Sequence, residues 1–390
     1  MPRRSARQIR ARVKSKPVGI QGNSKSRRYW WLAGLSGIIG ILSLVLIAGW
    51  MDRSPGRMRR LAEAATRSGQ WQTAGEYWRA VNATEAASAF THLEEAKACL
   101  ALGRAFQAEA ALRRSISADP TNLEPWRLLL EILRVEDRTL EVLQTGWKAY
   151  EKVQLEGRGA LLREMTLGVL ADLPDDLVRT TLRRWIDADG DDLDARIALL
   201  HRITIQPREA DPDRLTLLSE LESIVARFPN QISAREVLVT ALADSGEPER
   251  GRGLLEDWPI GARDARYWRL RGRWDLEYDR RPGDAVVAFR KALSELPQDW
   301  RSWYRLARAL HVLGREDESA QAAEAVSRIR EVLDPLLLGP RLDAAFDHLD
   351  MPSALNDLDK LCTRVGLLQL GQAWRTEAQT AGRVSGANSL

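Results

Sequence analysis

Residues 300–333 read WRSWYRLARALHVLGREDESAQAAEAVSRIREVL, and this stretch decides the fold. Apolar side chains recur every three or four positions on both sides of a glycine, which indicates two amphipathic helices. Gly314 stands between them, where a residue in the left-handed conformation commonly ends a helix. The stretch predicts a helix–turn–helix unit, which cannot bury its apolar faces alone and must stack on similar neighbours.

The same unit recurs along the chain with a period of 34 residues. Gly69 and Gly103 are one period apart, and Gly246 and Gly314 are two periods apart. The fourth copy carries a short insertion around Arg280-Arg281. Five recognisable copies occupy residues 55–85, 89–122, 232–259, 265–297 and 300–333.

Residues 123–231 fit the repeat less well. Asp137 replaces the turn glycine, and Gly146 stands where a bulky residue is usual. Amphipathic periodicity still predicts four helices there, over 158–171, 175–187, 193–204 and 214–227. We interpret the region as degenerate repeats within one continuous array.

These units resemble the tetratricopeptide repeat family. In the clearest copy the likeness is carried by Trp303, Leu306, Ala307, Leu310, Gly314, Ser319, Ala323 and Val326. The resemblance implies an all-α fold, a right-handed superhelical solenoid whose concave groove binds a protein or peptide. Membrane-anchored bacterial proteins of this layout serve envelope assembly, secretion and cytochrome maturation. The resemblance therefore implies a scaffold or adaptor role in assembling an envelope complex.

A membrane span is predicted near the N-terminus. Residues 29–50 read YWWLAGLSGIIGILSLVLIAGW and carry no charge, and a helix of this length crosses a bilayer. A cleaved signal peptide is the alternative, but its apolar region is usually shorter. We favour an uncleaved signal-anchor. The small residues Ala33/Gly37 and Ser36/Gly40 offer a face for a homodimer, although such pairs are common by chance.

Charge predicts the orientation of that span. Residues 1–28 hold ten of the 58 basic residues and no acid, whereas the rest of the chain has more acidic than basic side chains. The bias places the tail in the cytoplasm and the repeats outside it, in an inner-membrane protein with a single span. Five arginines within 51–70 favour the alternative, a cytoplasm-facing, membrane-docked recruiter of a soluble enzyme. Basicity confined to a terminal arm argues against nucleic-acid binding.

The predicted organisation has seven parts. They are a basic disordered cytoplasmic tail (1–28), the transmembrane helix (29–50), N-terminal repeats (51–123), degenerate helical repeats (124–231), C-terminal repeats (232–333), a C-terminal helical cap (334–380) and a disordered tail (381–390).

No motif of enzyme chemistry is found, and we expect no catalytic residue, cofactor or metal site. The stretch from Asp187 to Asp194 has three aspartates at the spacing of a calcium loop, but it lacks the glycine and the bidentate glutamate of that loop. An inter-repeat loop with an aspartate capping the next helix is the better interpretation. Cys99 and Cys362 lie in apolar helical patterns and are predicted to be buried, inert thiols rather than a disulfide. An enzyme site hidden in the poorly matching residues 123–231 or 335–355 is a third hypothesis.

One cluster of side chains is a candidate binding site. Six arginines recur at intervals of three or four on two predicted helices: Arg266, Arg269, Arg273, Arg301, Arg305 and Arg308. If they face the groove, they would form a wall suited to carboxylates of a partner. Arg301 and Arg305 match two basic positions of the family's carboxylate clamp, but its other residues are absent. The alternative is a solvated face paired to acids such as Asp275, Glu277 and Glu316.

Overall fold

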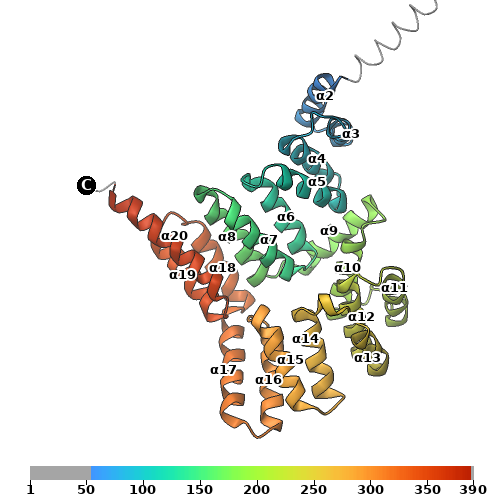
Figure 1. Ribbon diagram of the computed structural model, residues 1–390, viewed down its shortest axis with the longest axis vertical. Coiled ribbons are helices and arrows are strands. Elements are labelled where there is room, and N and C mark those ends of the chain that lie inside the picture. The colour runs from blue at the N-terminus through green and yellow to red at the C-terminus, as the bar shows by residue number, and fades with distance from the viewer. Residues whose placement is uncertain (1–53, 388–390) are drawn as a thin grey trace, which may run out of the picture. The chain divides into compact units, whose positions relative to one another are not determined.

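The computed structural model describes residues 54–387, and this range contains helices and no strand. The first half contains α2 (Pro55–Arg67), α3 (Trp71–Asn82), α4 (Ala89–Ala101), α5 (Ala105–Ala118), α6 (Leu123–Val135), α7 (Thr139–Lys152), α8 (Leu155–Leu170), α9 (Asp175–Ala188), α10 (Leu193–Ile205) and α11 (Arg214–Arg227) (Figure 1). The second half contains α12 (Ile232–Asp244), α13 (Pro248–Glu256), the 3-10 helix η1 (Ile260–Ala262), α14 (Ala265–Glu277), α15 (Pro282–Glu295), α16 (Trp300–Val312), α17 (Glu316–Val332), α18 (Pro335–Phe346), α19 (Pro352–Arg364) and α20 (Leu368–Ala387). The predicted all-α fold is confirmed.

The turns within the repeats use the residues that the pattern predicted. Gly69, Gly103, Gly246, Gly314 and Gly366 all have φ between 68° and 89°, each between the two helices of a pair. Two non-glycine residues share this conformation: Asp137, with φ 59°, and Arg280, with φ 54°, in the insertion of the fourth copy. Aspartate tolerates the left-handed region better than most side chains, so the degenerate repeat keeps its turn without glycine.

Tryptophans join the end of one repeat to the start of the next. Trp126 and Trp303 each donate the indole N–H to the carbonyl oxygen of the proline six residues earlier, Pro120 at 3.0 Å and Pro297 at 2.8 Å. Proline cannot donate a backbone hydrogen bond, and its own carbonyl is satisfied by the indole. This contact explains why the two residue types recur together at the repeat boundary.

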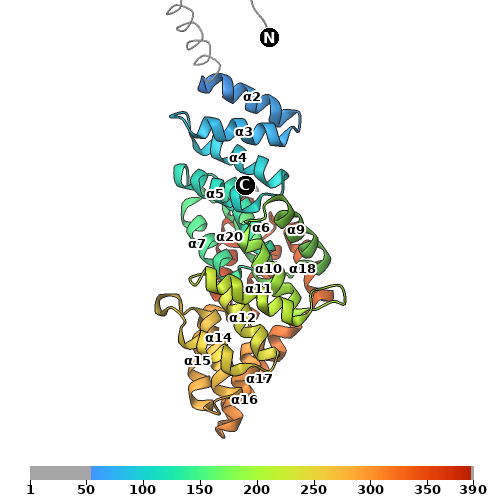
Figure 2. The ribbon, with the colours of Figure 1, turned by 90° about the vertical axis from the view of Figure 1, so that its right-hand side faces the viewer.

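The helices pair in sequence order, as Figure 2 shows for α2 to α5, but the predicted continuous array is interrupted at α8. This helix packs against α6 and α7, and the next helix it packs against is α20, from the far end of the chain (Figure 1). Met165 of α8 fills the space above Gly146 of α7, where a Cβ would lie 2.5 Å from the Met165 side chain. Gly146, which weakened the repeat pattern, therefore leaves the space in which α8 packs against α7.

Packing through α20 joins helices from α4 to α10 with helices from α17 to α20 in one core. Leu161, Leu162 and Met165 of α8 belong to the same buried cluster as Cys362 and Trp374. Helix α9 lies against α10 and α6 instead of following α8. The contacts run from α8 through α6, α9, α10, α12, α14, α16, α17, α19 and α20 and back to α8, so they form a closed circuit.

Two predictions about the ends of the chain need correction. No helix in residues 54–387 is both long and apolar enough to cross a bilayer, which contradicts the predicted inner-membrane localisation. The tail 1–28 and the segment 29–50, on which the span and the homodimer face were predicted, lie outside the described residues. At the other end, α20 runs to Ala387, so residues 381–387, expected to be disordered, continue this helix.

Candidate functional site

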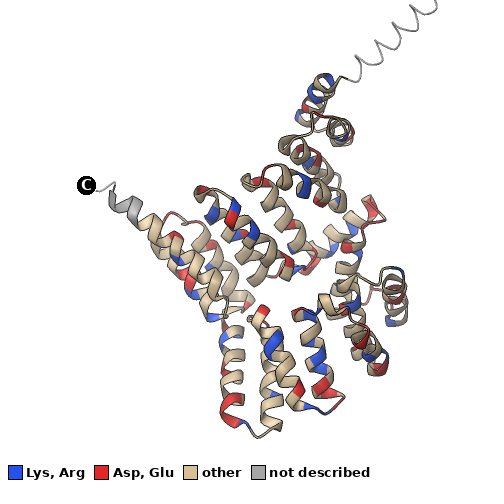
Figure 3. Cartoon of the chain, viewed as in Figure 1, with Lys and Arg blue, Asp and Glu red and all other residues tan. Residues whose placement is uncertain are grey.

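The six candidate arginines lie on α14 and α16, which begin at aspartate caps. Asp264 accepts the backbone N–H of Arg266 at 3.0 Å, and Asp299 accepts that of Arg301 at 3.1 Å. A capping carboxylate satisfies N–H groups that have no partner within the helix and favours its positive end. Figure 3 marks the Lys and Arg positions of both helices in blue. Spacings of three and four place the arginines of each helix on one side of that helix.

Arg266 and Arg269 line a cavity of about 150 Å³ between α10, α12, α14 and the α6–α7 turn. Arg266 pairs with Asp264 at 2.6 Å and donates to Ser233 Oγ at 3.1 Å. Arg269 forms an ion pair with Glu236 of α12 and lies 3.8 Å from Asp299. Arg266 is therefore bound by the capping acid of its own helix, and Arg269 by acids of the two neighbouring repeats.

A charge ladder joins α12, α14 and α16. Asp244 pairs with Arg273 at 2.8 Å, Arg273 with Glu277 at 3.0 Å, and Glu277 with Arg305 at 3.2 Å. Burial opposes ionisation of Glu277, but the hydrogen bonds and charges of the two arginines outweigh it and lower the pKa of this carboxyl. The ladder ties three successive repeats together along one face.

Arg301 and Arg308 differ from the other four arginines. Both are exposed, and within residues 54–382 neither has a carboxylate in ion-pair distance. The Arg301 guanidinium stacks 4.7 Å from the centroid of Trp300, and that of Arg308 lies 5.9 Å from the centroid of Tyr304, which is itself 53% exposed. These two side chains keep their charge available to another molecule.

Of the acids expected to neutralise this face, only one does so within the described structure. Glu277 takes part in the ladder, whereas Asp275 is buried and pairs with Arg271 and Arg281, each at 2.8 Å. Glu316 lies 3.1 Å from His311. The neutralising partners on the neighbouring helix, Glu236 and Asp244, are missed because no local spacing relates residues of different repeats.

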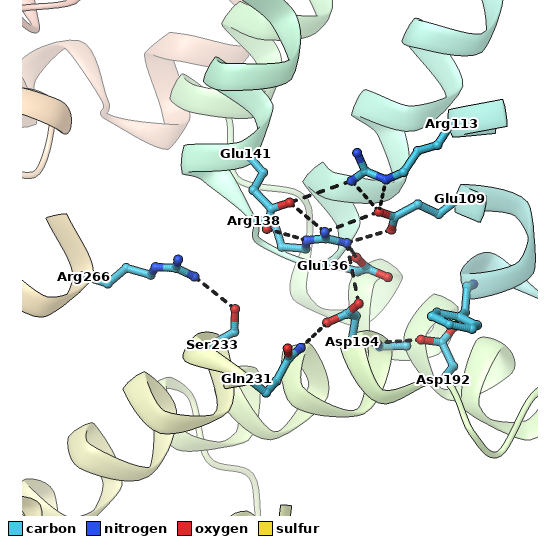
Figure 4. A network of polar contacts seen from close by, with 12 residues as sticks. Glu109, Arg113, Glu136, Arg138, Glu141, Asp192, Asp194, Gln231, Ser233 and Arg266 are labelled. Atoms are coloured by element: carbon cyan, nitrogen blue, oxygen red, sulfur yellow. Dashed lines mark hydrogen bonds and ion pairs between the residues drawn. The ribbon is translucent and has the colours of Figure 1, made fainter. Parts of the chain in front are cut away.

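A second polar cluster, also missed from the sequence, surrounds Arg138 in the α6–α7 turn (Figure 4). Its guanidinium contacts Glu109 of α5 at 2.8 Å, Glu136 at 2.7 Å and Glu141 of α7 at 2.7 Å, and Asp194 of α10 lies 3.8 Å away. One cation thus gathers four carboxylates from separate helices and turns. We call these five residues the Arg138 junction.

The Arg138 junction holds four carboxyl groups and one guanidinium, and burial makes ionisation of all four carboxyl groups energetically unfavourable. Burial raises the pKa of Glu136 to about 8 despite the opposing charge and hydrogen bond of Arg138. Burial also raises the pKa of Asp194, against the charge of Arg138. Oxygens of Glu109, Glu136 and Asp194 lie within 4.8 Å of one another, a spacing that can hold a metal ion, but Arg138 already supplies a cation to this group.

Asp137, beside the Arg138 junction, points to α10. Its carboxylate lies 3.2 Å from Nδ1 of His201. Burial would raise the pKa of Asp137, but the hydrogen bond and charge of His201, together with Arg202 and Arg269, lower it to about 2. The residue that replaces the turn glycine therefore also links two repeats.

The aspartate-rich loop before α10 is a helix cap, as predicted. Asp192 accepts the backbone N–H of Ala195 at 3.0 Å and that of Phe106 at 3.2 Å. Asp189 accepts the amide of Gln107 at 3.0 Å. The loop joins the start of α10 to the start of α5. Elsewhere in the chain, Cys99 of α4 and Cys362 of α19 are both buried free thiols, as predicted.

No protein-family model matches the sequence, and no curated protein matches it either. Among solved structures, the chain is similar to a tetratricopeptide repeat protein from Parabacteroides merdae, with 12% identity over 66% of this chain and 98% of that one and a TM-score of 0.32. It is also similar to yeast Tom70 (9% identity, 85% and 76% of the two chains, TM-score 0.30) and to the P58(IPK) TPR domain (16% identity, 85% and 99%, TM-score 0.28). At these identities and TM-scores, no property of those proteins is transferred to this chain.

Proposed function

We propose that the chain is a scaffold that binds an acidic segment of a partner protein along the exposed face of α16. The observation that carries this proposal is the state of Arg301 and Arg308, exposed and without a carboxylate partner in residues 54–382, on either side of the exposed Tyr304. Arginine and tyrosine are among the side chains enriched at the energetic centre of protein interfaces.

The neighbouring repeats prepare this face for binding. Because Arg305 is held by Glu277, and Arg273 by Glu277 and Asp244, the ladder fixes the backbone of α14 against that of α16. A rigid face loses little conformational entropy when a partner binds. The exposed Val312, two turns beyond Tyr304, adds an apolar contact to the same side of the helix.

The test uses a photo-crosslinking amino acid at Tyr304 in the full chain, expressed in its own cells. We expect a discrete adduct that disappears when Arg301→Glu and Arg308→Glu are combined. The matched control combines Arg60→Glu and Arg227→Glu, which reverse two exposed charges on α2 and α11 and should leave the adduct intact.

The protein in the adduct is then identified, and an acidic segment of it is titrated against the purified chain. Binding should weaken at least tenfold in the Arg301/Arg308 variant and should weaken as salt is raised, because the charges involved are exposed. An adduct that survives the double reversal, or binding that is insensitive to salt, would show that this face is not the binding site.

A further inference from the structure

A groove of about 450 Å³ lies between α6 and α9, apart from the α16 face. Its walls are mainly apolar, with Leu128, Ile132 and Val135 from α6 and Leu177, Val178 and Trp185 from α9. Ile132 and Val178 are almost fully buried, whereas Leu177 is 55% exposed at the opening. Its volume lies within the range of small-molecule sites, which are typically apolar with a few placed polar groups.

The groove exists because the sequential stacking of helices is interrupted at α8. The apolar side of α8 packs against α6, α7 and α20. Residues 171–174 then connect α8 to α9, which packs against α6 and α10. Helix α9 meets α6 over only a short length, and Leu173 from the crossing segment completes the wall. The two helices are therefore held apart by their other neighbours, and the space between them is a consequence of the fold.

The polar groups of the groove carry an unpaired positive charge. Arg134 is half-buried, its Nε is shielded from solvent without a hydrogen-bond partner, and no carboxylate in residues 54–382 is in ion-pair distance of it. Burial lowers the pKa of Arg134, and Glu164 and Glu131 offset this only in part. An unsatisfied buried donor is costly, so its presence in a native fold requires an explanation.

A second arginine lies on the opposite wall. Arg184 of α9 is exposed and has no acidic partner among the described residues, although its side chain runs along the turn at Gly103. Glu131 also lines the groove, but it is exposed and forms no ion pair with either arginine. Among the side chains that line the groove, two cations face one anion, and one carboxylate would neutralise this excess positive charge.

We propose that the groove between α6 and α9 binds an amphiphilic monocarboxylate of the fatty-acid type. The apolar body would lie against Ile132, Val178 and Trp185, and the carboxylate would accept hydrogen bonds from Arg134 and Arg184. A guanidinium suits a carboxylate because it offers two parallel donors. The apolar walls argue against inorganic phosphate, which would leave them uncovered.

The test is calorimetric titration of the full chain with decanoate below its micelle concentration, with decanol as the uncharged control. We expect saturable one-to-one binding of decanoate and binding of decanol at least tenfold weaker. Arg134→Met and Arg184→Met should each weaken decanoate about tenfold, the size of one lost charge-assisted hydrogen bond. Arg227→Met, on an exposed arginine that stacks on Phe228, is the matched control and should bind decanoate unchanged.

The unfolding temperatures of the variants distinguish loss of the binding site from misfolding. Arg134 has no acidic partner to lose, so Arg134→Met should unfold at the wild-type temperature or above it, and the exposed Arg184→Met should keep wild-type stability. Thr181→Trp, which fills the groove from α9, should abolish binding of decanoate and decanol alike. Decanoate binding that is absent, or that all these variants retain, would overturn the proposal. So would a groove that binds an acidic apolar peptide but not decanoate.

Discussion

Trp374 donates its indole N–H to Thr166 Oγ1 at 2.9 Å, joining α20 to α8 across 208 residues of sequence. Both side chains are fully buried, and Thr166 in turn donates to the Leu162 carbonyl at 2.7 Å. This buried hydrogen bond lies in the same core as the apolar side chains of Leu161, Leu162 and Met165. It is also the place where the circuit of helices closes.

Thr166→Val should therefore destabilise the whole chain. The substitution keeps the shape but leaves the buried indole N–H without an acceptor, which costs about 1–3 kcal/mol of the free energy of unfolding. Trp374→Ala should cost more, about 3–5 kcal/mol, because it also leaves a cavity. Urea unfolding followed by circular dichroism measures both. Thr376→Val, on the exposed side of the same helix, is the control and should change little.

The Arg138 junction should make stability fall as pH rises through neutrality. The pKa of Glu136 is raised to about 8 in the folded chain, from 4.5 for an ordinary glutamate. The folded state thus binds a proton that the unfolded state has already lost, so its contribution is complete below pH 4.5 and disappears between there and about pH 8. Asp194, whose pKa is also raised, acts in the same direction.

Unfolding of Glu136→Gln, measured between pH 5 and 8.5, should show a shallower fall than the wild type. Asp137→Asn provides the contrast, because the pKa of Asp137 is lowered to about 2. Its contribution is present above pH 3.8 and is lost as pH falls toward 2, so the pH dependence that this carboxyl contributes by its own ionisation lies at acid pH, below that of Glu136. An unaltered slope in Glu136→Gln would refute the role given to that residue.

Two glycines test whether turn conformation, rather than space, governs stability. A Cβ would meet nothing within 4 Å at Gly314 or at Gly283, but Gly314 has φ 68° and Gly283 lies in α15. Gly314→Ala should cost about 1–2 kcal/mol from the left-handed conformation. Gly283→Ala should stabilise the chain by about 0.5–1 kcal/mol. Thermal unfolding of the pair should shift in opposite directions, and equal shifts would contradict the explanation.

Both cysteines should be unreactive in the folded chain. Burial raises the pKa of the Cys362 thiol to about 12 and also raises that of Cys99, so little thiolate forms at neutral pH. We expect a disulfide reagent such as Ellman's to label neither thiol until urea unfolds the chain, and then to label two. Rapid labelling of the native protein would mean that one of these helices opens readily.

Much of the fold follows from local patterns. The boundaries of α16 and α17 could be predicted from residues 300–333 because helix periodicity and turn glycines act within a few residues. The helices within residues 123–231 can be predicted for the same reason. Packing of α8 against α20 could not be predicted, because each helix alone shows only an apolar face and nothing local identifies its partner.

In the candidate site, too, local sequence predicts some features and tertiary packing determines the others. Spacing of three and four correctly placed the arginines along α14 and α16, but it could not reveal that Glu236 and Asp244 on α12 pair with Arg269 and Arg273. The Arg138 junction escaped notice because its four carboxylates come from distant segments, where each resembles an ordinary surface acid. Partners across repeats are set by stacking, which becomes visible only in three dimensions.

Closure between α8 and α20 constrains how this chain can change over evolution. An open array of repeats can be lengthened or shortened by duplicating or deleting a unit, since each unit contacts only its neighbours. Inserting or deleting one helix pair between α9 and α18 would move α20 away from α8 and break the hydrogen bond between Trp374 and Thr166. The number of units between these two helices is therefore fixed by geometry, whereas α2 and α3, which lie outside the circuit, can be gained or lost without breaking it.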